Sequence, residues 1–265
     1  MIDLHCHLLP AIDDGAVDLA MSLEMARIAV DDGIRTVACT PHIYPGMYDN
    51  DAPGIRRAIS LLQAELDAAG LPLRLLPGAD VHLDTGLVEG IRDDRIPTLA
   101  GSRYLLLEPP HHIAPPRFEA SVFALMAAGY VPVITHPERL RWVEHDFAKF
   151  RTLVDRGVWM QVTAGALTGR FGKRVTYWAE RFVGEGMTHL LATDAHHPVR
   201  RPPLLAEARD CAERLLGAQE ALHLVHTRAD GIVRDLPPDA LPPLPVPVSG
   251  TGGRRGLWQR LRGAA

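Results

Sequence analysis

Two histidines near the start of the chain have the spacing of a metal-binding pair. His5 and His7 follow the apolar residues Ile2 and Leu4, which indicate a short strand. Side chains two residues apart on a strand point to the same face, so the two imidazoles lie together while Cys6 points to the other face. Two neighbouring imidazoles suit a divalent metal ion. A single His-x-His pair is a weak signal, and the remaining ligands must come from elsewhere in the chain.

Further potential ligands follow other apolar stretches of the sequence, at the point where each expected strand ends. These residues are His42, Asp80, Glu108, His136, Asp194 and His196, and the loop after the first strand adds Asp13 and Asp14. The carboxyl ends of the strands of an α/β barrel converge on one face, where active sites lie. Carboxylate and imidazole ligands together favour manganese, iron or zinc. Each of these side chains alone also has a structural interpretation, such as capping a helix or lying solvated in a loop.

The elements that must position these residues alternate along the chain. We expect strands at residues 34–39, 73–76, 104–107, 131–134, 158–162 and 189–192, after the opening strand. We expect helices at residues 17–32, 55–69, 84–92, 117–128, 145–156, 172–185, 203–217 and 218–226. Strand–helix alternation predicts a parallel sheet with crossover helices. Because polar residues end so many strands, a closed α/β barrel is favoured over an open sheet, which would collect its ligand at one switch point.

Composition narrows the class of protein. The 265 residues are 47% hydrophobic and 23% charged, which is typical of a globular chain. The net charge of −4 argues against bulk nucleic-acid binding. The three cysteines, Cys6, Cys39 and Cys211, are too few and too far apart for a disulfide framework or a thiolate zinc site. No signal-peptide pattern and no transmembrane run is visible, so we expect a soluble, cytoplasmic protein.

The composition changes near residue 235. Residues 236–253 are rich in proline and glycine, which predicts an extended linker rather than a helix or a central strand. Residues 254–262 form a short basic stretch that contains Trp258. We therefore expect a catalytic barrel at residues 1–234 and a linker with a basic tail at residues 235–265. The tail is either disordered or makes, at most, a peripheral contact with acidic lipid or an acidic protein.

The combination of motifs resembles the polymerase and histidinol phosphatase family. It comprises His-x-His, Thr-Pro-His, a strand-end glutamate, His-Pro-Glu-Arg and a closing Asp-x-His, in this order. The opening MIDLHCHLLPAIDDGA is closer still to one branch, the bacterial metal-dependent protein tyrosine phosphatases of capsular and extracellular polysaccharide synthesis. The resemblance extends from residue 1 to about residue 234. It implies an α/β fold, a distorted (β/α)₇ TIM-like barrel.

The resemblance also implies three metal ions, with manganese expected and iron or zinc as alternatives. The first would be held by His5, His7, Glu108 and Asp194, and the second by Asp80, Glu108 and His136, with Glu108 bridging. The third would be held by Asp14, His42 and His196, with Asp13 as a less favoured substitute for Asp14. Asp80 departs from the branch, where this position is usually glutamate, so the second ion would be held more loosely or through water.

The implied reaction is hydrolysis of a phosphomonoester. Neighbouring metal ions neutralise the phosphate and activate a water molecule for in-line attack. Arg139 and Arg201 match two active-site arginines of the branch, and guanidinium forks bind phosphate oxygens in pairs. The phenolate of tyrosine, with a parent pKa of about 10, needs little protonation to leave. His42 or His196 would assist, although a metal-bound histidine is not a simple acid.

Several functions compete with this interpretation. The favoured one is a phosphatase of phosphotyrosine proteins, acting on a membrane tyrosine kinase of polysaccharide export. A small-molecule phosphatase, such as a histidinol-phosphate phosphatase, would use the same metals. A C–N hydrolase on a similar barrel usually carries a bridging lysine, and no lysine ends an expected strand here. A cysteine-based phosphatase needs a Cys-x₅-Arg loop, which the sequence lacks. The last alternative is a non-catalytic binding module without metal.

Overall fold

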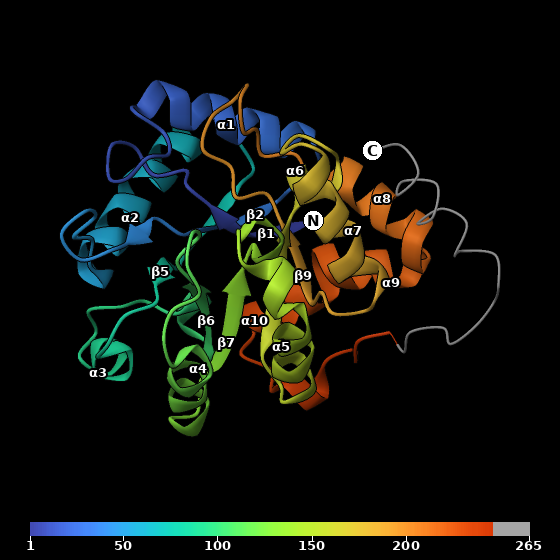
Figure 1. Ribbon diagram of the computed structural model, residues 1–265. Helices are drawn as coiled ribbons and strands as arrows, with labels where there is room; N and C mark the ends of the chain where they lie inside the picture. Colours follow the sequence, from blue (N-terminus) through green and yellow to red (C-terminus); the bar gives the residue numbers. More distant parts are fainter. Residues whose placement is uncertain (246–265) are drawn as a thin grey trace.

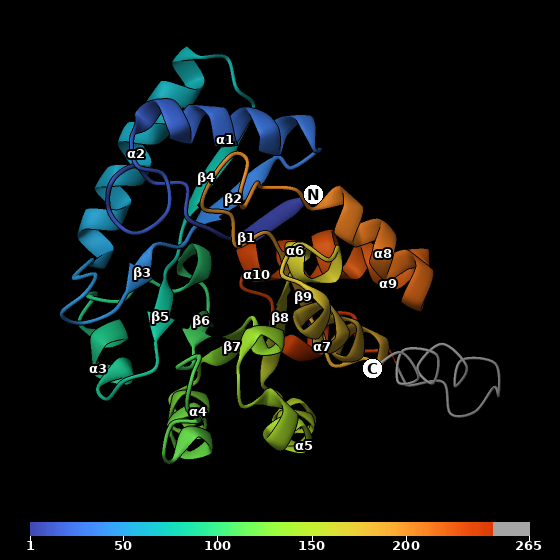
Figure 2. The same ribbon diagram turned by 45° about the horizontal axis from the view of Figure 1, so that its top comes forward.

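The computed structural model describes residues 1–245 and consists of parallel strands surrounded by helices (Figures 1 and 2). The strands are β1 Ile2–Cys6, β2 Thr36–Cys39, β3 His42–Ile43, β4 Arg74–Pro77, β5 Asp80–His82, β6 Tyr104–Glu108, β7 Val131–Thr135, β8 Trp159–Thr163 and β9 Leu190–Ala192. The α-helices are α1 Leu19–Asp31, α2 Ala52–Ala68, α3 Leu87–Arg92, α4 Phe118–Ala127, α5 Val143–Asp155, α6 Ala164–Leu167, α7 Lys173–Gly184, α8 Ala206–Leu216, α9 Ala218–Leu222 and α10 Arg228–Val233.

The strands close into a distorted barrel. One sheet has the order β1-β2-β4 and the other the order β3-β5-β6-β7-β8-β9, with all pairs parallel. β3 continues the path of β2 after Thr40 and Pro41, and β5 continues the path of β4 in the same way. The nine strands of residues 1–245 therefore occupy seven strand positions around the barrel. A parallel bridge between Cys6 and Ala195 joins the two ends of this arrangement. The predicted α/β barrel is therefore confirmed.

Local sequence explains the placement of the helices. The side chain of Asp18 accepts a hydrogen bond from the backbone N–H of Met21 at 2.8 Å and caps α1. Asp51 caps α2 in the same way at Gly54, at 2.7 Å. The apolar face of α2, which includes Ile59, Leu62 and Leu66, is buried. The helices bury such faces against the outside of the barrel, as the strand–helix alternation requires.

The inner face of the barrel changes from apolar to polar along the strands. In β6, Tyr104 and Leu106 belong to an inner apolar cluster and Glu108 follows on the same face. In β8, Trp159 belongs to that cluster, and Gln161 and Thr163 follow. The apolar half fills the amino-terminal end of the barrel, so the polar side chains are left to gather at the carboxyl-terminal end.

An irregularity in β1 helps to place the histidine pair. The pairing of β1 with β2 shifts in register between Asp3 and Cys6. Leu4 belongs to the inner apolar cluster, yet His5, the next residue, lies in the polar site. Strict alternation would put these two neighbours on opposite faces, so the shift allows β1 to supply both.

The segment expected to be a linker begins differently from the prediction. Residues 235–245 pack against the amino-terminal end of the barrel, where the hydroxyl of Tyr104 donates to the carbonyl of Leu236 at 2.8 Å. The buried guanidinium of Arg228 pairs with Glu220 at 2.7 Å and donates to the carbonyls of Pro242 and Pro243 at 2.9 and 2.8 Å. Proline favours extended backbone, but these carbonyls still accept hydrogen bonds. The expected basic tail lies outside the described residues.

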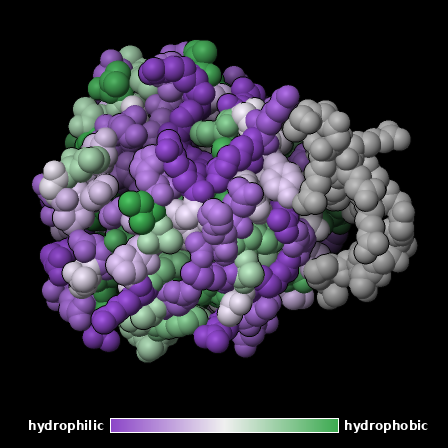
Figure 3. Space-filling view, viewed as in Figure 1, coloured by the Kyte–Doolittle hydropathy of each residue, from purple (hydrophilic) through white to green (hydrophobic). Residues whose placement is uncertain are grey.

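The surface seen in Figure 3 is mostly hydrophilic, with small separate hydrophobic areas. Within residues 1–245, no helix combines the length and the apolar character needed to cross a bilayer.

Candidate active site

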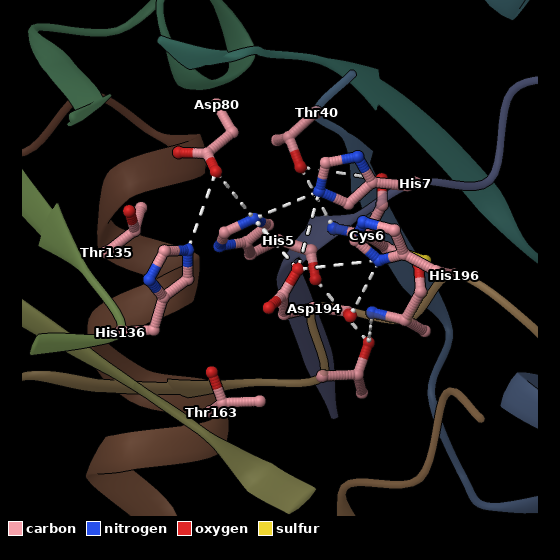
Figure 4. Close-up of polar contacts among 12 residues, drawn as sticks. His5, Cys6, His7, Thr40, Asp80, Thr135, His136, Thr163, Asp194 and His196 are labelled. Atoms are coloured by element: carbon pink, nitrogen blue, oxygen red, sulfur yellow. Dashed lines mark hydrogen bonds and ion pairs between the residues drawn. The ribbon is translucent and has the colours of Figure 1, made fainter. Parts of the chain in front are cut away.

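His5 in β1 and His7 just after it present their Nε2 atoms to the same space, 3.2 Å apart (Figure 4). The Nδ1 of His5 lies 2.9 Å from Oε1 of Gln161, and the Nδ1 of His7 lies 2.6 Å from Oδ2 of Asp13. Each partner oxygen accepts the Nδ1 proton, which leaves the Nε2 lone pair available to a metal. Gly15 allows this loop to close, because a Cβ there would lie 2.3 Å from the carbonyl oxygen of His7.

Asp80 lies at the centre of the site. Its Oδ2 is 3.4 Å from Nε2 of His5, 3.7 Å from Nε2 of His136 and 3.6 Å from Nδ1 of His42. Glu108 lies farther along, with Oε1 3.6 Å from Nε2 of His136 and Oε2 3.5 Å from Nδ1 of His42. Asp80 therefore contacts both His5 and His136, whereas Glu108 contacts His136 and His42, and the expected sharing of Glu108 between two ions stays a prediction.

A third group forms on the opposite side of His42. The Oδ1 of Asp14 is 3.4 Å from Nε2 of His42 and 3.2 Å from Nε2 of His196. Asp13 instead turns inward to His7 and accepts the backbone N–H of His42 at 3.1 Å. The two adjacent aspartates thus have different surroundings, with only Asp14 facing the pair of imidazoles.

Asp194 connects the histidine pair of β1 to the two arginines. Its Oδ1 lies 3.4 Å from Nε2 of both His5 and His7. Its Oδ2 pairs with Arg139 and, at 2.5 Å, with Nη2 of Arg201. The backbone of Asp194 has a φ of 49°, in the left-handed region, which aspartate adopts more readily than most non-glycine residues.

The donor set fits metal ions. Both carboxylate oxygens of Asp80 are buried and have no hydrogen-bond donor among the described residues, and Nδ1 of His136 is also unpartnered. A buried carboxylate is costly unless a cation or donors satisfy it. Burial would lower the pKa of His7, but Asp13 and Asp194 outweigh it and raise the pKa to about 10. The site therefore favours positive charge, which bound cations supply.

The ligand atoms form compact groups. Within each group, the candidate atoms lie within 4.8 Å of one another. The groups are His7–Asp14–His42–His196, His5–His7–Asp80, His5–His136–Asp194, Glu108–His111–His136 and His42–Asp80–Glu108. All nine residues predicted as ligands occur in at least one group.

A pocket of about 650 Å³ opens above these groups. Its lining includes Asp14, His42, Glu108, His136, Asp194 and His196 together with both arginines, whereas His5, His7 and Asp80 lie beneath it. Tyr44 and Tyr48 from the loop after β3, and His111 and His112 from the loop after β6, complete the wall. The site thus has cation ligands at its floor and arginines at its side.

Several contributing residues were not predicted from the sequence. Gln161 lies within an apolar strand, and nothing in the spacing marks it as the partner of His5. The Nε2 of His111 lies 3.1 Å from Oε1 of Glu108. Asp3 does not face the ligands, because it accepts the backbone N–H groups of Thr193 and His5 at 3.0 and 3.3 Å.

The cysteines offer no nucleophile at this site. Cys6 and Cys39 are buried, and both belong to the outer apolar cluster. Burial raises the pKa of both thiols well above the usual range. Since the thiolate is the reactive form, a cysteine-based phosphatase mechanism has no support here.

Comparison with known proteins places the chain in a family. The family model described as "Capsular polysaccharide synthesis, CpsB/CapC" matches residues 1–234. The chain belongs to the CpsB/CapC family. The CpsB/CapC member YwqE of Bacillus subtilis (strain 168), a tyrosine-protein phosphatase, is 36% identical over 246 residues, covering 93% of this chain and 96% of YwqE. The tyrosine-protein phosphatase CpsB of Streptococcus pneumoniae is 26% identical, covering 89% and 99%.

Solved structures agree with this CpsB/CapC assignment. One chain from the structures of YwqE and Streptococcus pneumoniae CpsB, described as unique metal-dependent tyrosine phosphatases, matches with a TM-score of 0.86 and 36% identity. The match covers 89% of this chain and 96% of that one. Histidinol phosphate phosphatase from Lactococcus lactis matches with a TM-score of 0.53 and 13% identity, covering 85% and 96%, which shows a shared fold alone. The predicted family and its branch are therefore confirmed.

Proposed function

We propose that this chain is a metal-dependent protein-tyrosine phosphatase, a phosphoric monoester hydrolase acting in capsular or extracellular polysaccharide synthesis. The main support for the proposal is the buried carboxylate of Asp80, which makes no hydrogen bond but lies among three histidines, below a pocket lined by two arginines. Membership of the CpsB/CapC family supports the same activity.

Three metal ions fit the grouping of the ligands best. We assign His5, His7, Asp80 and Asp194 to the first, Asp80, Glu108 and His136 to the second, and Asp14, His42 and His196 to the third. Asp80 would help to hold both of the first two ions, since its Oδ2 is near both His5 and His136. Manganese is the expected metal, with iron or zinc as alternatives. When bound, such ions neutralise phosphate charge and activate water for attack on phosphorus.

Arg139 and Arg201 are proposed to bind the phosphate oxygens of the substrate. Both guanidinium groups line the pocket and pair with Oδ2 of Asp194. A guanidinium carries five N–H donors in a planar fork, so one donor can hold the aspartate while others bind phosphate. A phosphoryl group bound in this way would lie beside the proposed metal ligands.

His42 and His196 fit the role of ligands better than that of general acids. Burial and the neighbouring His7 lower the pKa of His196 to about 4, so the ring is neutral at pH 7. Its Nδ1 lies 3.0 Å from the carbonyl oxygen of Asp194, to which it donates, and its Nε2 faces Asp14. A tyrosine phenolate leaves without full protonation. The phenolic leaving group therefore makes a dedicated acid unnecessary.

The proposed substrate is a phosphotyrosine protein, and the proposed partner is a membrane tyrosine kinase of polysaccharide export. The setting is cytoplasmic, with at most peripheral membrane contact and no nucleic acid. A histidinol-phosphate phosphatase remains the alternative, because it would use the same ligands. The two substrates differ in the leaving group, which is an aryl oxygen in one and an alkyl oxygen in the other.

The deciding experiment compares phosphate release from a phosphotyrosine peptide and from histidinol phosphate. The protein is reconstituted with Mn²⁺, and His136→Ala serves as the blank. Fast release from the peptide that the blank loses supports the proposal. Preference for histidinol phosphate retains the metal chemistry but overturns the substrate, and release from neither ester overturns the phosphatase proposal.

A further inference from the structure

Two of the exposed apolar side chains line the pocket. Among residues 1–245, the exposed large apolar side chains are Val17, Leu19, Met47, Leu61, Ile113, Val199 and Leu222. Val17, Met47, Ile113 and Val199 lie in loops that follow β1, β3, β6 and β9, at the carboxyl ends of the strands. Met47 and Ile113, 63% and 75% exposed, also line the pocket. Scattered exposed apolar residues are normal, but two that also line the pocket indicate a contact surface there.

The pocket has two chemically different sides. Arg139 and Arg201 form the cationic side. On the other side, the ring of Tyr44 stacks on His82, with centroids 3.9 Å apart and an interplanar angle of 7°. Tyr48 stacks on His42 at 5.5 Å, with an angle of 20°. These ring pairs fix the loop after β3, which also carries Met47. An aryl phosphate oriented by the arginines would therefore lie with its apolar part toward the Tyr44 side.

We infer that Met47 and Ile113 form a rim subsite for apolar side chains that flank the phosphotyrosine of the substrate protein. The inference rests on the proposed function and extends it to the substrate's sequence. A small phosphate ester that fills the pocket leaves both side chains in water, because they lie at its edge. A polypeptide with apolar flanking residues removes them from water, which is the favourable direction of the hydrophobic effect.

The test uses substrates that differ only in the flanks. Two phosphotyrosine peptides of equal charge carry leucine or serine on both sides of the phosphotyrosine, and phenyl phosphate reports on the chemistry alone. The variants are Met47→Ser, Ile113→Ser and their combination. Leu61→Ser is the matched control, because Leu61 is 72% exposed on α2 and does not line the pocket.

The parent should prefer the leucine peptide by roughly fivefold in kcat/KM, mainly through KM, as expected for partial burial of two apolar side chains. The double variant should lose this preference and keep phenyl phosphate turnover within about twofold, as should Leu61→Ser. Three results would overturn the rim subsite. They are an equal loss of kcat/KM on phenyl phosphate in the double variant, a preference for the leucine peptide that persists in that variant, and a parent without this preference. A parent that hydrolyses no phosphotyrosine substrate overturns the proposed function as well.

A separate observation concerns the arginines. The ring of Phe171, in the loop between α6 and α7, contacts both of them, with its centroid 5.1 Å from Cζ of Arg139 and 5.7 Å from Cζ of Arg201. The loop packs closely, since a Cβ on Gly165 would lie 3.0 Å from Cε2 of Phe171. A guanidinium over an aromatic face is attracted by the ring and keeps its N–H donors available. We infer that Phe171 is a positioning residue for both phosphate-binding arginines.

Phe171→Leu should raise the inhibition constant of inorganic phosphate and lower kcat/KM, each by about fivefold to tenfold, with unchanged manganese content. Phe171→Tyr should restore both, and Phe171→Met replaces the leucine variant if that one does not fold. Phe147→Leu is the matched control, because Phe147 contacts Arg181 at 3.9 Å and does not line the pocket. Unchanged phosphate inhibition in the leucine or methionine variant, or an equal change in Phe147→Leu, overturns the assignment.

Discussion

Asp13 contacts the side of the His7 ring opposite its Nε2, with Oδ2 of the aspartate 2.6 Å from Nδ1 of the imidazole. The same oxygen accepts the backbone N–H of His42, so one carboxylate orients residues of two candidate metal groups. Buried partners of this kind fix the tautomer of a ligand and raise its basicity. The neighbouring Asp14 faces the imidazoles of His42 and His196 instead.

We expect Asp13→Ala to weaken manganese binding by about 10- to 100-fold without removing a site, because the ligands remain but His7 loses its orientation. Asp13→Asn should lose less, since an amide oxygen still accepts the Nδ1 proton. Asp14→Ala should instead lower the number of ions bound per chain. Titration of the metal-free protein with Mn²⁺ distinguishes affinity from stoichiometry, and identical behaviour of the two alanine variants would contradict the distinction.

Asp80→Ala should have the largest effect on metal content, because its carboxylate lies beside both His5 and His136. We expect fewer bound ions and a loss of phosphatase activity of at least about 100-fold, because removing a ligand should cost more than the roughly 10- to 100-fold typical of groups that only orient one. Asp94→Ala is the control, since Asp94 pairs with Arg56 on the exposed surface. Metal analysis of the purified proteins checks the prediction, and equal stoichiometry in parent and Asp80→Ala would refute it.

Thiol alkylation should leave the phosphatase activity unchanged, whereas metal removal should abolish it. Because burial raises the pKa of Cys6 and Cys39, iodoacetamide should leave kcat/KM within about twofold of the untreated value. A chelator should abolish activity, and Mn²⁺ should restore it. Mass spectrometry locates the alkylated residue, and Cys211, the more accessible thiol, is expected to react. Inactivation that follows alkylation of Cys6 would contradict a purely metal-based mechanism.

His189 should make the protein less stable in mild acid. Burial and the nearby Arg228 hold its pKa well below the usual value of 6.5, and its Nδ1 accepts the backbone N–H of Met160 at 3.1 Å. A lowered folded-state pKa means that the unfolded chain binds the proton first, so this contribution is complete above about pH 6.5 and is lost as the pH falls. The loss is at most about 1.4 kcal/mol per pH unit.

His189→Asn tests this contribution, since asparagine can accept the same hydrogen bond but does not titrate. The measurement is the free energy of unfolding by denaturant between pH 5 and pH 8, conditions chosen to bracket the ordinary histidine range. The variant should show a shallower decline below about pH 6.5 than the parent. Parallel curves would indicate that other groups carry the acid sensitivity.

The sequence predicted the barrel because long apolar strands and amphipathic helices alternate clearly. It missed β3 and β5, since two- and three-residue strands are too short to show a period. Helical structure after residue 217 also differs, with a π-helical turn at His223–Thr227 followed by α10 rather than one helix ending near residue 226. Such a turn leaves little trace in apolar spacing.

That the candidate ligands lie close together could be predicted from the sequence, but their grouping could not. Each candidate follows an apolar stretch, so its place at the carboxyl end of the barrel could be inferred. Whether Asp80 or Glu108 contacts His5 depends on how the strands pack around β1, and no local sequence pattern encodes that packing. Gln161 and Phe171 were missed for a related reason, because their partners are distant in sequence.

Residues 235–245 lie at the end of the barrel opposite the pocket. Pro245 lies beside Gly186, in the turn before β9, and Leu236 lies at the start of β6, so both mark the amino-terminal end of the barrel. The pocket opens at the other end. A chain fused at residue 245 would therefore start on the side of the molecule away from the catalytic opening. The enzyme could be immobilised or tethered from that side while a bulky phosphoprotein approaches the opposite one.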